Sequence, residues 1–83
     1  MAFKYRDSVL IELTRHGVEP REDTPPELVH DFVNDLYVYE IRALRRKQRA
    51  GQIPRQDYAN HVKALRSRYP ILSLPIKYWA EQS

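Results

Sequence analysis

Basic residues are concentrated between residues 42 and 68 of the sequence, where they could bind phosphate groups. Arginine offers a planar fork of N–H donors and lysine a compact ammonium charge, and both suit the phosphates of a nucleic acid. The candidate phosphate-binding residues are Arg42, Arg45, Arg46, Lys47, Arg49, Arg55, Lys63 and Arg66. A second interpretation stays open, because bases near the C-terminus of a helix and acids near its N-terminus each stabilise it by about 0.3–1 kcal/mol. The acids that precede these bases are Glu27, Asp31, Asp35 and Glu40.

Glu40 is the one carboxylate that falls within an apolar pattern, between Leu36 and Leu44. A carboxylate in an apolar setting must find a partner or take up a proton. We predict that Glu40 pairs with a basic residue or accepts a hydrogen bond from a tyrosine hydroxyl. The alternatives are a functional carboxylate in a small cleft and simple exposure to solvent.

No other group of residues has the spacing of a catalytic or metal site. The chain contains no cysteine, so disulfides, thiolate metal sites and cysteine nucleophiles are excluded. His16, His30 and His61 lie in different segments, and none has the i, i+3 or i+4 partner of a helical zinc site. The sequence also lacks a glycine-rich phosphate loop and a nucleophile elbow. We therefore predict a non-enzymatic protein with no metal and no cofactor.

The element that positions the charged residues is a long helix from about residue 25 to residue 50. Thr24 and Glu27 have the spacing of a capping box, with Pro25 at the first helical position. Gly51 follows as a C-terminal cap. One half of the helical wheel holds Leu28, Val29, Phe32, Val33, Leu36, Tyr37, Tyr39, Ala43 and Leu44. That sector is too wide for a single partner helix to cover.

Two further helices are predicted on either side of the long one. The first runs from about Asp7, with Asp7 or Ser8 as its cap, to His16 and ends at Gly17. A short strand at residues 9–11 is the alternative for this segment. The other covers about residues 54–69, before Pro70. Its apolar stripe comprises Tyr58, Val62, Leu65 and Tyr69. The short turn at residues 51–53 predicts that this helix packs antiparallel against the long one.

The C-terminal segment, residues 71–79, is the most apolar stretch of the chain. Pro70 and Pro75 predict an extended tail. Exposed to water, such a tail would favour aggregation, so we expect it to be buried against its own helices or against another chain. The candidate partner-binding residues are Leu74, Ile76, Tyr78 and Trp79.

The composition fits one folded domain, residues 1–83. The chain has 83 residues, of which 42% are apolar, and its net charge is only +3. That apolar share is too high for a disordered protein, and no apolar run reaches the roughly 20 residues that span a bilayer. We predict an all-α three-helix domain in the cytoplasm, without a membrane contact. The leading functional prediction is a protein–protein interaction module, with a homodimer as one form of it. The alternative is a small nucleic-acid-binding protein.

Overall fold

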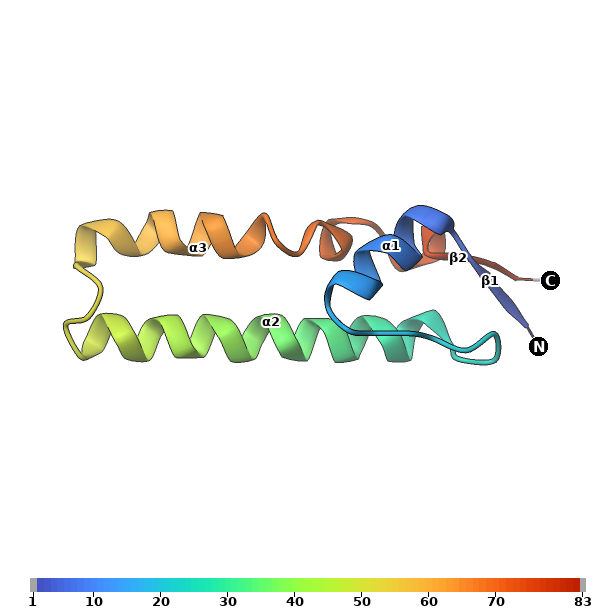
Figure 1. The fold of residues 1–83 in the computed structure, drawn as a ribbon, viewed down its shortest axis with the longest axis horizontal. Coiled ribbons are helices and arrows are strands. Elements are labelled where there is room, and N and C mark those ends of the chain that lie inside the picture. The colour runs from blue at the N-terminus through green and yellow to red at the C-terminus, as the bar shows by residue number, and fades with distance from the viewer. Residues whose placement is uncertain (1, 83) are drawn as a thin grey trace.

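The computed structural model describes residues 2–82, and it is built on a helical hairpin. The long helix α2 and the shorter α3 lie antiparallel and side by side, and both termini are at the end of the hairpin opposite its turn (Figure 1). The regular elements are β1 (Phe3–Tyr5), α1 (Asp7–Arg15), α2 (Pro26–Arg49), α3 (Tyr58–Arg66) and β2 (Ala80–Gln82). Three short 3-10 helices complete them: η1 (Arg55–Asp57), η2 (Pro70–Ser73) and η3 (Ile76–Tyr78). The predicted small helical domain with a long central helix is confirmed.

Helix α2 matches its predicted bounds to within one residue, but its predicted capping box is wrong. The helix has 24 residues and is about 36 Å long. Pro26 occupies the first turn, and Pro25 has the extended backbone (φ −62°, ψ 137°) that a following proline favours. This moves the helix start one residue beyond the reach of Thr24. The Thr24 hydroxyl instead accepts a hydrogen bond of 3.0 Å from the backbone N–H of Arg21.

Glycine ends the first two helices, as predicted. Gly17 and Gly51 have φ values of +73° and +79°, in the region where a side chain would be strained. The chain reverses after Gly51 and buries Ile53 at the turn. Helix α3 is shorter than the predicted 54–69, because its first residues form η1 and residues 67–68 form a turn shortly before Pro70.

The C-terminal segment does not form the predicted extended tail. It winds into η2 and η3, and Trp79 is completely buried, with its indole N–H donating to the carbonyl of Leu74 at 2.9 Å. It then forms β2, which pairs antiparallel with β1 so that Tyr5 faces Ala80. The two strands were not predicted, because three residues are too few to show an alternating pattern.

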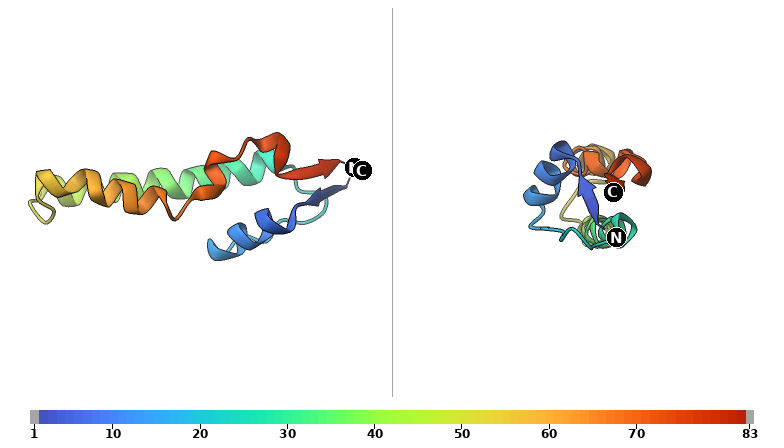
Figure 2. Two further views of the ribbon diagram at one scale, coloured as in Figure 1. Left: turned by 90° about the horizontal axis from the view of Figure 1, so that it is seen from above. Right: turned by 90° about the vertical axis from the view of Figure 1, so that its right-hand side faces the viewer.

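The core lies at one end of the hairpin, where α1 and the C-terminal segment pack against α2 and α3 (Figure 2). Its buried residues are Tyr5, Val9, Leu13, Val29, Val33, Leu65, Tyr69, Ile71 and Trp79. The other end of the hairpin has only two helices, and the molecule measures 50 × 18 × 16 Å. Its radius of gyration is 15.3 Å, against about 12 Å for a compact domain of this length. None of the helices in residues 2–82 has the length and apolar character that crossing a bilayer requires.

Candidate functional site

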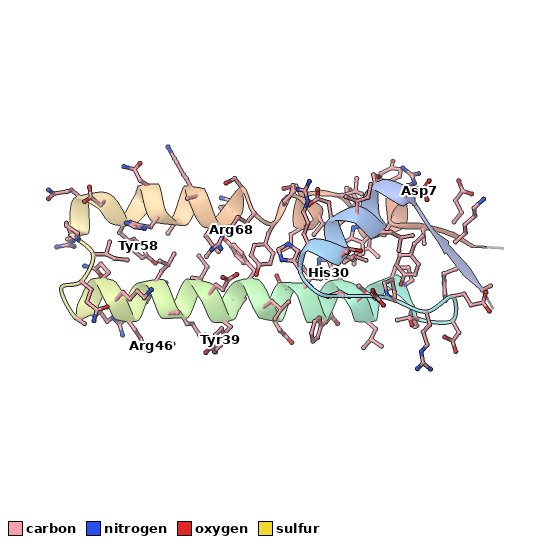
Figure 3. The ribbon with its side chains drawn as sticks, in the orientation of Figure 1. Asp7, His30, Tyr39, Arg46, Tyr58 and Arg68 are labelled. Carbon is pink, nitrogen blue, oxygen red and sulfur yellow. The ribbon has the colours of Figure 1, made fainter. Side chains whose placement is uncertain are left out.

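One face of α2 has no partner within the fold. We call it the outer face, and it comprises Leu28, Asp31, Phe32, Asp35, Tyr39, Arg42, Arg46 and Arg49. Tyr39 and Arg46 lie on the side of α2 turned away from α3 (Figure 3). Leu28 is 63% exposed, Phe32 54% and Tyr39 67%. These are among the most exposed large apolar side chains of the described residues.

The exposure follows from the width of the apolar sector of α2. Val29 and Val33, on the side that faces the core, are 4% and 0% exposed. At 100° per residue, Leu28, Phe32 and Tyr39 lie within about 40° of one another and about 80–120° from the centre of that buried side. Neighbouring helices can contact only one side of α2, so its apolar sector extends beyond what the fold covers.

The charges of the outer face are arranged by sign along α2. Asp31 and Asp35 lie in the first half, whereas the arginines lie in the last turns. Among residues 2–82, the polar partner of the Asp31 carboxylate is its neighbour His30, with Nδ1 at 3.4 Å from Oδ1. Within residues 2–82, Asp35 and the arginines at positions 42, 45, 46 and 49 take part in no side-chain hydrogen bond or ion pair. The four arginines line a shallow hollow of about 230 Å³.

The structure brings together only part of the predicted phosphate-binding set. Lys47 is exposed on the same helix but does not line the arginine hollow. Arg55 and Lys63 are exposed on η1 and α3, and Arg66 lines a separate hollow with Tyr37 and Tyr69. The arginine hollow is therefore a feature of α2 alone.

The predicted partner-binding residues of the C-terminal segment are mostly occupied within the fold. Trp79 is 0% exposed and belongs to the core, so it is not available to a partner. Leu74 and Ile76 are half-buried. Tyr78 is exposed, and its ring lies beneath the Arg6 guanidinium and the Lys77 ammonium, at 5.5 and 5.1 Å from the ring centroid.

Glu40 has the partners that the sequence predicts. The Tyr69 hydroxyl donates a short hydrogen bond to Glu40 Oε2, and Arg68 Nη2 lies 3.4 Å from Glu40 Oε1. The ring of His16 stacks on Tyr69 at 4.2 Å, so the end of α1 joins the same cluster. Both carboxylate oxygens are thus engaged by donors from beyond α2, which indicates a structural role for Glu40.

The cluster borders a hollow of about 530 Å³. Its lining residues are Arg15, His16, Leu36, Glu40, Ser67, Arg68 and Tyr69. The contributions of Arg15 and His16 were not predicted, because only the tertiary fold brings α1 beside the middle of α2. Arg15 is already paired with Glu12 at 3.1 Å, so the hollow is polar without being strongly charged.

Because of Tyr69, the stability of the fold decreases at alkaline pH. Burial and the hydrogen bond to Glu40 raise the pKa of Tyr69 to about 12, whereas an unfolded tyrosine titrates near 10. The folded state therefore holds the phenol proton more tightly, and this contribution to stability is lost as the pH rises from about 10 to about 12. We expect the free energy of unfolding, measured by urea denaturation, to fall across that range.

The matched control for this prediction is Tyr69→Phe, which removes the phenol and keeps the ring. Burial also raises the pKa of Tyr5, so the variant should keep a part of the alkaline loss. Equal slopes of unfolding free energy against pH in the two proteins would contradict the role of Tyr69.

No protein-family model matches this sequence, and the searches of curated proteins and of solved structures found no similar protein.

Proposed function

We propose that this protein is a non-enzymatic protein–protein interaction module that binds its partner on the outer face of α2. The observation that carries the proposal is the row of Leu28, Phe32 and Tyr39, each more than half exposed on one stripe of a rigid helix. Aromatic side chains and arginine are enriched at protein interfaces, where they act as anchors. A cytoplasmic location, predicted from the sequence, is part of the same proposal.

The geometry of α2 favours a helical or flat protein surface over a small ligand. The exposed side chains are spread over three turns of a straight helix, so they form a ridge and no enclosed pocket. Small ligands are bound in concave sites that bury most of their surface. Burial of the three apolar side chains against a partner would remove the largest exposed apolar feature of α2 from water.

Site-specific photo-crosslinking in source cells tests the proposal. A photoreactive phenylalanine at position 32 should crosslink to a protein. The matched control places the same residue at Ile11 of α1, which is 58% exposed against 54% for Phe32. The proposal predicts a crosslinked protein from position 32 and none from position 11. Equal crosslinking from both positions, or none from position 32, would contradict it.

A second candidate function is nucleic-acid binding, and the arginine hollow is the observation that favours it. Four guanidinium groups without an acidic partner in residues 2–82 would suit a phosphate backbone. Fluorescence anisotropy with labelled DNA and RNA at about 50 mM salt tests this function, since the affinity should fall steeply with salt. Replacement of Arg42 and Arg46 by glutamine should weaken binding. The control, Arg55 and Arg66 replaced by glutamine, should have a smaller effect.

A further inference from the structure

The order of charges along the outer face of α2 indicates which charges a partner surface must carry. Acids occupy its first half and arginines its last turns, so like charges are neighbours at i, i+4, as for Asp31 with Asp35 and Arg42 with Arg46. Such like-charge pairs at i, i+4 destabilise a helix. The fold supplies no opposite charge to Asp35, Arg42 or Arg46 within residues 2–82. A partner that does so must be basic opposite one half and acidic opposite the other.

A second copy of α2 in the reverse direction has this pattern. We infer that two copies of this chain associate through their outer faces, with the two α2 helices antiparallel about a two-fold axis beside Tyr39. Asp35 and Arg42 are equally far along the chain from the point between Val38 and Tyr39, and so are Asp31 and Arg46. Reversing one helix about that point therefore places each aspartate opposite an arginine of the other copy. The inference rests on the proposed function and specifies its partner.

The apolar residues of the outer face fit the same arrangement. The two Tyr39 rings meet at the axis, because Tyr39 is next to the midpoint. Phe32 is within one residue of the position that faces Arg46, so the Phe32 ring of one copy lies beside the guanidinium and alkyl stem of Arg46 in the other. Arginine stacks favourably on aromatic rings, and its stem covers apolar surface. A parallel pair would instead oppose arginine to arginine and aspartate to aspartate, which like-charge repulsion disfavours.

The surface area of the single chain is large enough for such an interface. The chain exposes 6257 Å², whereas a compact monomer of 9.9 kDa exposes about 5,200 Å². The difference is similar to the area, about 800 Å², that each partner buries in a standard interface. Exposed ion pairs contribute little individually, so we expect a dimer of modest affinity that weakens as salt screens the charges.

Charge reversal in the purified full-length chain tests the inference by sedimentation velocity at low salt. Asp35→Arg opposes arginine to Arg42 twice in a symmetric dimer, and Arg42→Asp opposes two aspartates. Each should weaken self-association about tenfold or more. The double variant Asp35→Arg/Arg42→Asp restores both pairs and should again form a dimer.

The matched control is Asp35→Arg/Arg66→Asp, which has the same net charge as the restoring variant. Arg66 lies on α3, away from the outer face, so this control should remain monomeric. Circular dichroism of each variant checks that the helices are retained.

Three results would overturn the inference: a wild-type chain that is monomeric at about 1 mM, undiminished self-association of Asp35→Arg, or equal recovery in the control. A wild-type monomer that still crosslinks another protein from position 32 would leave the proposed function intact and reject only the dimer. Absence of any crosslink from that position would reject the proposed function itself.

Discussion

Replacement of Trp79 by alanine is expected to leave the protein largely unfolded at room temperature. Trp79 is the largest completely buried side chain, and its indole N–H is satisfied by the carbonyl of Leu74. Removing a buried aromatic side chain of this kind costs about 3–5 kcal/mol. That is as much as the whole core of a domain of this size supplies. Urea denaturation followed by circular dichroism measures the loss.

The effect should extend to the N-terminal strand, because Trp79 also holds the two ends of the chain together. Its backbone carbonyl accepts a hydrogen bond of 3.0 Å from the N–H of Arg6, next to the pairing of β1 with β2. The control is Tyr78→Ala, since Tyr78 is the exposed aromatic neighbour and its loss should cost less than about 1 kcal/mol. A Trp79→Ala protein as stable as the Tyr78→Ala protein would contradict the position of Trp79 in the core.

Replacement of Leu65 by alanine should release α3 from α2. Leu65 is the only side chain of α3 that is fully buried, and truncating a buried leucine costs about 2–5 kcal/mol. Helix α3 has nine residues, and isolated helices shorter than about 12–15 residues are marginal in water. We therefore expect the backbone amides of α3 to lose most of their protection from hydrogen exchange.

The loss of protection should be unequal along the hairpin. Amides of α2 near Val29 and Val33 should keep more protection than those of α3, because the core that contains these valines also includes residues of α1 and of the C-terminal segment. Lys63→Ala changes an exposed residue of the same helix and should alter stability by less than about 0.5 kcal/mol. Uniform loss of protection over α2 and α3 would show that the hairpin opens only with the whole domain.

The two functional proposals differ in what the arginines of α2 contact. In a dimer, Arg42 and Arg46 lie opposite Asp35 and Asp31 of the other copy. In a nucleic-acid complex, the same guanidinium groups contact phosphates, and Asp35 would face the polyanion. The nearby acids favour the dimer, because they would repel a phosphate backbone that followed the helix.

Local features of the sequence were sufficient to predict the long helix, the hairpin and the bonding of Glu40. Pro25 and Pro26 mark the start of α2, and Gly51 marks its end. Proline and glycine each act through the backbone conformation of their own position. Because the turn at residues 51–53 is short, α3 has to run antiparallel to α2. Glu40 needed a donor wherever it was buried, so the kind of partner was predictable even though Tyr69 and Arg68 were not.

Tertiary packing alone decided which part of the apolar sector of α2 is buried and which forms the outer face. A helical wheel shows that Leu28, Val29, Phe32 and Val33 are neighbours, but not where α1, α3 and the C-terminal segment make contact. Likewise, the pattern of the C-terminal segment showed that it needs burial, and only the fold placed Trp79 in the core while leaving Tyr78 exposed. The physical reason is that backbone preferences act between near neighbours in the chain, whereas burial is shared among segments that the folded chain brings together.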